Sequence, residues 1–206
     1  MCEGHTERDY FQRLNKWYGE EYGFSIHLAP RKQRHDKSFP PLAAVKEAVR
    51  RSKDLRGAQR KNVWAVFDRD EHTDIYKACR LAREEGINIA FSHPHFELWL
   101  WLHFASGVPG RLDGDRTWVP EKLAGVRGFK DFHKRLDESH FALLRDRKRA
   151  VRLARELVDR CPSGCCSAKG KAAGEPAHAV GCDVLLRDPS TDVYRILEFL
   201  HMVETP

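Results

Sequence analysis

The chain has 206 residues, a formal net charge of +6 at pH 7 and a sequence pI of about 9.1. This length suits one domain of generous size, or one domain with an appended subdomain. No apolar run reaches the roughly eighteen residues of a membrane-spanning helix, and the first residues are too charged for a signal peptide, so we expect a cytoplasmic protein. The positive charge is typical of polyanion-binding proteins, and also of an ordinary solvated basic surface.

Residues 1–105 alternate between helix and strand patterns. Apolar residues recur at three and four positions in some segments, and short apolar runs separate these segments. The predicted helices are 6–18, 42–55 and 74–85, and the predicted strands are 22–28, 63–67 and 87–91. This alternation predicts an α/β fold with a mostly parallel sheet flanked by helices.

Residues 106–206 are expected to form a helical C-terminal part. Just before it, residues 94–104 are apolar almost all round, which predicts a helix buried on every side. The further expected helices are 129–136, 141–160 and a last one capped by Ser190 or Thr191. Residues 161–182 are rich in glycine, alanine, lysine and cysteine, and are interpreted as a flexible loop or insertion.

Three acidic residues carry the candidate chemistry. Asp68 and Asp70 follow an apolar run, and residues two apart on a strand project from the same face. They would stand at the carboxyl end of a buried strand, where open α/β sheets bind ligands. With Glu3 they make a three-acid set of the kind that holds Mg²⁺. Each acid alone is equally typical of a turn, and Glu7 of a first helical turn favoured by the helix dipole.

The order of these motifs resembles the Toprim domain and, more closely, the RloB-like family. The resemblance runs in order over nearly the whole chain, and its most specific part is the Phe96-Glu97-Leu98-Trp99 block. The segments that carry it are Cys2-Glu3-Gly4-x-Thr6-Glu7-x-x-Tyr10-Phe11, Phe67-Asp68-Arg69-Asp70, Ser92-x-Pro94-x-Phe96-Glu97-Leu98-Trp99-Leu100-x-Leu102-His103-Phe104 and Asp188-Pro189-Ser190-Thr191-Asp192-Val193.

The resemblance implies a Toprim-like catalytic core over residues 1–105 and a Mg²⁺-dependent nuclease, acting on DNA or RNA in anti-phage defence and abortive infection. Asp68 and Asp70 would hold Mg²⁺ or Mn²⁺, directly or through water, and Glu3 would be a general base or acid or a further metal ligand. A co-encoded ATPase or restriction-system protein is the implied partner. The alternative is a non-catalytic nucleic-acid-binding or regulatory protein on a Toprim scaffold.

One departure from the family pattern concerns the first strand. A Toprim core has an apolar strand leading into the catalytic glutamate, whereas only two residues precede Glu3 here. We therefore expect a truncated first strand, or a native chain that begins upstream of Met1.

Glu97 is a carboxylate inside an almost wholly apolar segment, which is costly unless it is paired or functional. It is either a fourth, catalytic acid at the metal site or the partner of a buried arginine such as Arg69.

Two further groups are candidates for binding. Basic residues that could follow a phosphate backbone, or simply form a solvated helix face, are Arg69, Arg145, Lys148, Arg149 and Arg152. Potential ligands of a structural zinc ion are Cys161, Cys165, His178 and Cys182. Their spacing matches no strong zinc template, and thiols in a loop are the favoured alternative.

Overall fold

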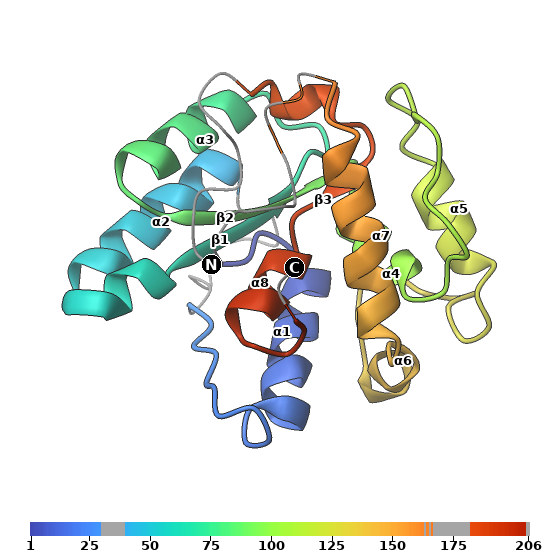
Figure 1. Ribbon diagram of the computed structural model, residues 1–206, viewed down its shortest axis with the longest axis horizontal. Helices are drawn as coiled ribbons and strands as arrows, with labels where there is room; N and C mark the ends of the chain where they lie inside the picture. The colour runs from blue at the N-terminus through green and yellow to red at the C-terminus, as the bar shows by residue number, and fades with distance from the viewer. Residues whose placement is uncertain (30–39, 163, 165, 167–181, 205–206) are drawn as a thin grey trace.

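The computed structural model describes residues 1–29, 40–162, 164, 166 and 182–204. These residues form a small sheet with helices on both faces (Figure 1). The strands are β1 (Trp64–Asp68), β2 (Asn88–His93) and β3 (Ser190–Thr191). The helices are α1 (His5–Tyr18), α2 (Pro41–Lys53), α3 (Ile75–Glu84), α4 (Glu97–Leu102), α5 (Trp118–Ala124), α6 (Glu138–Leu143), α7 (Arg147–Asp159) and α8 (Tyr194–Phe199), with short 3-10 helices η1 (Gly57–Asn62) and η2 (Val184–Leu186).

The sheet is mixed, with the strand order β1-β2-β3. β1 and β2 are parallel, and Asp68 lies opposite Ser92 at their carboxyl ends. β3 is antiparallel to β2 and places Thr191 opposite Ser92. The structure thus confirms the α/β class with a small mixed sheet, in which β1 and β2 are parallel and the C-terminal part of the chain returns in the opposite direction as β3.

Residues 1–3 pair with the other side of β1. Cys2 forms an isolated parallel bridge with Val66. The amide of Val66 donates to the carbonyl of Met1 at 2.7 Å, and the amide of Glu3 donates to the carbonyl of Val66 at 3.0 Å. Residues 1–3 therefore pair with β1 through one bridge and two hydrogen bonds, which place Glu3 beside the end of β1.

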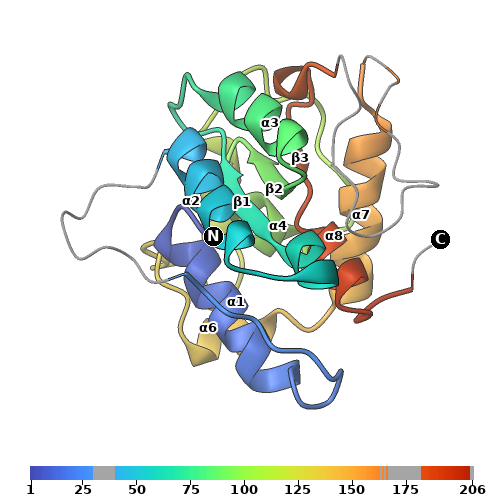
Figure 2. The same ribbon diagram turned by 90° about the vertical axis from the view of Figure 1, so that its left-hand side faces the viewer.

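The two faces of the sheet bury different residues because successive strand side chains alternate. Ala65 and Phe67 of β1 join a core with α2 and α3 on one face. Trp64 and Val66 join a larger core on the opposite face, with α1, α4, α7 and α8. Figure 2 shows α2 and α3 together in front of the sheet, with α7 and α8 to the side.

The larger core contains residues from both predicted parts of the chain. Trp99 of α4 and Leu153 of α7 are both fully buried in it. Four residues of α4 are buried with Glu97, which confirms the helix buried on nearly all sides. The predicted division at residue 105 stays a prediction.

Four predicted elements differ from the structure. Ser190 and Thr191, which were expected to cap the last helix, pair with β2 as β3, and Val193 is the N-cap of α8. The predicted helix 141–160 is divided into α6 and α7, because Asp146 caps α7 by accepting a hydrogen bond from the amide of Arg149 at 3.0 Å. Residues 129–136 are irregular, and the amide of Leu136 donates to Asp9 instead at 3.2 Å. Residues 22–28 form no strand: the amide of Ile26 donates to the Asn15 side chain at 2.7 Å, and their apolar side chains pack against the larger core.

Within the described ranges, none of the helices is both long and apolar enough to cross a membrane.

Candidate functional site

Asp68 and Asp70 lie at the carboxyl end of β1, as predicted. Asp68 is the last residue of the strand, and the amide of Phe96 donates to its Oδ2 at 3.4 Å. Asp70 follows in the left-handed region of the backbone, with φ of 32°, which aspartate tolerates better than most residues. Its amide donates to the carbonyl of Pro94 at 3.3 Å. The segments after β1 and β2 are thus tied together at the site.

Glu3 reaches the same edge of the sheet from the N-terminal bridge. Its side chain is 3% exposed, and its Oε2 accepts a hydrogen bond from the amide of Asp68 at 3.3 Å. Its Oε1 pairs with Nε2 of His72, which lies in the turn after β1. Both carboxylate oxygens of Glu3 are therefore held in place by residues that follow β1.

Two further buried acids come from the first turns of α1 and α4. Glu7 is 4% exposed and Glu97 is 6% exposed. The hydroxyl of Thr6 donates to Oε1 of Glu97 at 3.2 Å and lies 3.3 Å from the carbonyl oxygen of Lys134. Glu97 therefore pairs with a hydroxyl, whereas the guanidinium of Arg69 donates to the carbonyl of His72. We call Glu3, Glu7, Asp68 and Glu97 the acid cluster.

Burial and mutual repulsion favour the neutral forms of Glu3, Glu7 and Asp68. The pKa of Glu3 is raised to about 8, mainly by burial; the charges of Asp70 and Asp74 also raise it, while the hydrogen bond from Asp68 and the charge of Lys134 lower it. Burial, followed by the charges of Glu97 and Glu3, likewise raises the pKa of Glu7 to about 8.

The pKa of Asp68 is also well above its ordinary value. Burial is the main cause, and the charges of Glu7, Glu3, Glu97 and Asp70 add to it. Four neighbouring acids thus act on this one carboxyl group. Neighbouring buried acids of this kind are stabilised either by sharing protons or by binding a cation.

The donor set fits Mg²⁺ or Mn²⁺, because both are hard cations that prefer carboxylate and water oxygens. No three carboxylates of the described residues have oxygens that all lie within 4.8 Å of one another. This spacing suits a Mg²⁺ ion that keeps several of its waters and contacts only one or two carboxylates directly. Asp68 and Asp70 are the residues that would hold the ion. Glu3 is next to Asp68, because its carboxylate accepts a hydrogen bond from the amide of Asp68.

Gly4 is required for the position of Glu7. A Cβ added at Gly4 would overlap with Oε2 of Glu7, although the backbone of Gly4 itself is extended and accepts any residue. We therefore expect Gly4→Ala to displace the Glu7 carboxylate and to lower metal-dependent activity by about tenfold, with a change in Tm of only a few degrees. Steady-state kinetics and thermal unfolding of the same preparation measure both effects. A Tm loss that accounts for all the lost activity would contradict this role.

The predicted basic residues of the C-terminal part lie on one helix. Lys148, Arg149 and Arg152 are exposed on α7, and Arg145 is exposed just before it. Arg149 pairs with Asp146 at 3.0 Å. Arg69 instead follows Asp68 at the end of β1, and its guanidinium donates to the carbonyl of His72.

Two of the four predicted zinc ligands lie in the part of the chain that the structure describes. Cys161 and Cys182 lie close together, whereas Cys165 and His178 lie outside the described residues. Cys166, which was not among the predicted ligands, joins the first two.

Sequence reasoning missed several neighbours of the acids. Thr6 and Glu7 belong to the first motif, and their place one helical turn after Glu3 was the available signal. His72 and Lys134 have no such signal, because a turn and an irregular segment bring them to the cluster.

Of the comparisons with known proteins, the one with family models finds a match. The model of the family described as RloB-like protein matches residues 1–200. Neither the curated proteins nor the solved structures contain a significant match.

Proposed function

The chain belongs to the RloB-like protein family, and on that premise we propose that it is a Mg²⁺- or Mn²⁺-dependent nuclease of the cytoplasm. It would hydrolyse phosphodiester bonds of DNA or RNA on a Toprim-like core, in defence against phage. The observation that carries this proposal is the convergence of Glu3, Glu7, Asp68 and Glu97 at the carboxyl end of β1.

Each acid has a distinct role in this proposal. The bound ion would polarise the scissile phosphate and neutralise charge on the leaving oxygen. Asp68 and Asp70 would bind the ion. Glu3, whose pKa is raised by burial in the metal-free protein, would act as a general acid or base, or as a further ligand of the ion. Glu97, which accepts a hydrogen bond from the Thr6 hydroxyl, would be a further acid at the site.

The nucleic acid would be held by positive charge. Arg145, Lys148, Arg149 and Arg152 are exposed on or beside α7, Lys134 acts electrostatically on Glu3, and Arg69 follows Asp68 at the end of β1. Phosphate contacts by such residues release counterions, so binding should weaken steeply as salt is raised.

Incubation of the purified protein with plasmid DNA and with tRNA, in Mg²⁺, Mn²⁺ or EDTA, tests the proposal. We expect cleavage of at least one substrate with either metal and none in EDTA. The variant Asp68→Ala should leave the substrate intact. Equal cleavage by this variant and the wild type would show that the site is wrong. Binding that survives EDTA, with no product under any metal, would support the non-catalytic alternative.

A further inference from the structure

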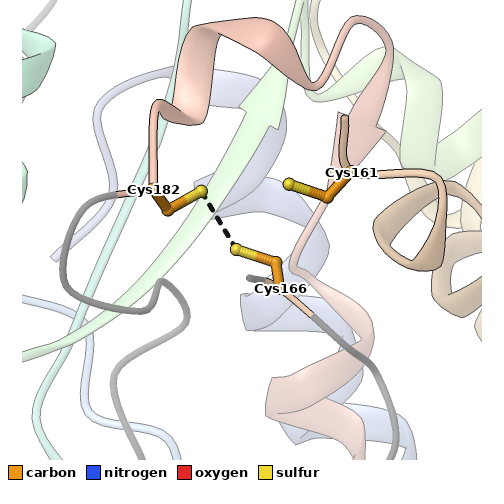
Figure 3. A group of neighbouring side chains, drawn as sticks. All are labelled: Cys161, Cys166 and Cys182. Atoms are coloured by element: carbon orange, nitrogen blue, oxygen red, sulfur yellow. Dashed lines mark hydrogen bonds between the residues drawn. The ribbon is translucent and has the colours of Figure 1, made fainter. Parts of the chain in front are cut away.

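Three of the described cysteines, all in the C-terminal half of the chain, come together from different segments. Cys161 follows α7, and Cys182 lies just before η2. Cys166 lies between them in sequence, with four residues separating it from Cys161 and fifteen from Cys182. Figure 3 shows the three side chains directed toward one another, with their sulfur atoms around a common space.

The sulfur atoms have a spacing suited to a metal ion. All three lie within 4.8 Å of one another, and those of Cys166 and Cys182 are 3.0 Å apart. A tetrahedral zinc ion with Zn–S distances of about 2.3 Å requires sulfurs roughly 3.8 Å apart. Shifts of less than about 1 Å would therefore satisfy the ion. Among the described residues, this is the one group of three ligating side chains that lies so close together.

The surroundings are also suited to a charged zinc–thiolate group. Cys161 is 6% exposed and Cys166 is 3% exposed. Three thiolates and Zn²⁺ have a net charge of −1, which is costly to bury without a counter-ion. Arg187 is 2% exposed and interacts electrostatically with all three cysteines. Arg187 also pairs with Asp192 at 3.4 Å, so its positive charge is shared between that carboxylate and the cysteines.

We propose that Cys161, Cys166 and Cys182 bind a structural zinc ion, in a site separate from the acid cluster and independent of the proposed nuclease activity. Soft sulfur ligands select zinc, whereas the oxygen ligands of the acid cluster select Mg²⁺ or Mn²⁺. A structural zinc ion takes four ligands, so the fourth would come from outside this group of three cysteines.

The zinc ion would fasten the chain that leads to β3. From Cys182 the chain passes through η2 and Arg187 to Ser190 and Thr191. The hydroxyl of Thr191 hydrogen bonds to that of Ser92 at 2.8 Å, and Ser92 lies opposite Asp68 in the sheet. The site would therefore stabilise the strand that borders the candidate active site.

Metal analysis of the full chain tests the proposal. After purification under reducing conditions and refilling with zinc, we expect about one tightly held zinc ion per chain. Chelation should lower Tm by about 5 °C or more. Replacement of zinc by Co²⁺ should produce intense thiolate-to-cobalt charge-transfer absorption, which reports on the wild-type protein without any substitution.

Matched variants locate the ion. Cys161→Ser and Cys182→Ser should lose most of the zinc and the charge-transfer band. Cys79→Ser, which alters another buried cysteine, should retain both, as should Asp68→Asn in the acid cluster. Wild-type protein that holds less than about a tenth of an equivalent of zinc would overturn the proposal. Cobalt absorption without a thiolate-to-cobalt charge-transfer band would also overturn it. A Cys166–Cys182 disulfide in protein purified from cells with a reducing cytoplasm would do the same.

Discussion

Asp68→Asn should lower the rate of metal-dependent cleavage by about 100-fold or more, while the variant folds as stably as the wild type or more so. Asparagine has the shape of aspartate and retains an oxygen for the amide of Phe96. The substitution removes the carboxylate of Asp68, whose pKa the charges of Glu7, Glu3, Glu97 and Asp70 all raise. Loss of that charge weakens metal binding and also relieves repulsion in the metal-free protein. Cleavage kinetics and thermal unfolding in EDTA measure the two opposite effects.

Asp131→Asn is the matched control for this substitution. Asp131 is exposed and lies in the irregular segment after α5, so the same chemical change should leave both rate and Tm unaltered. Comparable activity in Asp68→Asn and Asp131→Asn would contradict a metal-binding role for Asp68. A large loss of Tm in Asp68→Asn would instead mean that its carboxylate stabilises the fold.

The protein without divalent cations should become less stable as pH rises from about 5 to about 8. The pKa values of Glu3 and Glu7 are about 8 in the folded protein and 4.5 in the reference state. Between these values the unfolded chain has released protons that the folded chain still holds, so stability falls with pH. We expect Tm to decrease by about 5 °C or more over this range, a figure that corresponds to a few kcal/mol for a chain of this size.

Mg²⁺ at millimolar concentration should remove most of this decrease, because a bound cation compensates the charges at high pH. Glu7→Gln should flatten the pH dependence in EDTA, since it removes one of the acids whose pKa is raised. Glu84→Gln, at the exposed end of α3, should reproduce the wild-type curve. A Tm that rises with pH in EDTA, or that Mg²⁺ leaves unchanged at pH 8, would contradict the acid cluster as a cation site.

The strands β1 and β2 and the helices α1, α2 and α3 were predictable because their signals are local, whereas Ser190 and Thr191 of β3 were expected to cap a helix. The apolar run before Asp68 and the periodic residues of α1, α2 and α3 specify element type directly. Residues 22–28 show the limit of this reasoning: their apolar side chains pack against the core without pairing in a sheet. The pattern reports burial, whereas a strand also requires an available edge to pair with. Asp146 likewise divides a continuous helical pattern by capping α7.

The candidate site was predictable only where sequence motifs supply it. Asp68 ends β1 and Asp70 follows two residues later in a turn, so the sequence was sufficient to place both at this strand end, although only Asp68 lies on the strand. Glu3 lies beside them because one bridge between Cys2 and Val66 positions it, a contact that no local pattern specifies. His72, Lys134 and Cys166 come from turns and irregular segments. Their positions depend on tertiary packing, which periodicity does not encode.

The most direct test of the acid cluster is a calorimetric titration of the full chain with Mg²⁺ and with Mn²⁺. Saturable binding should occur in the wild type and in Asp131→Asn, and Asp68→Asn should bind at least about tenfold more weakly. Cys182→Ser should bind Mg²⁺ as the wild type does, because the cysteines lie in a separate site. Equal Mg²⁺ affinity in the wild type and in Asp68→Asn would contradict the assignment of these acids as a metal-binding catalytic centre.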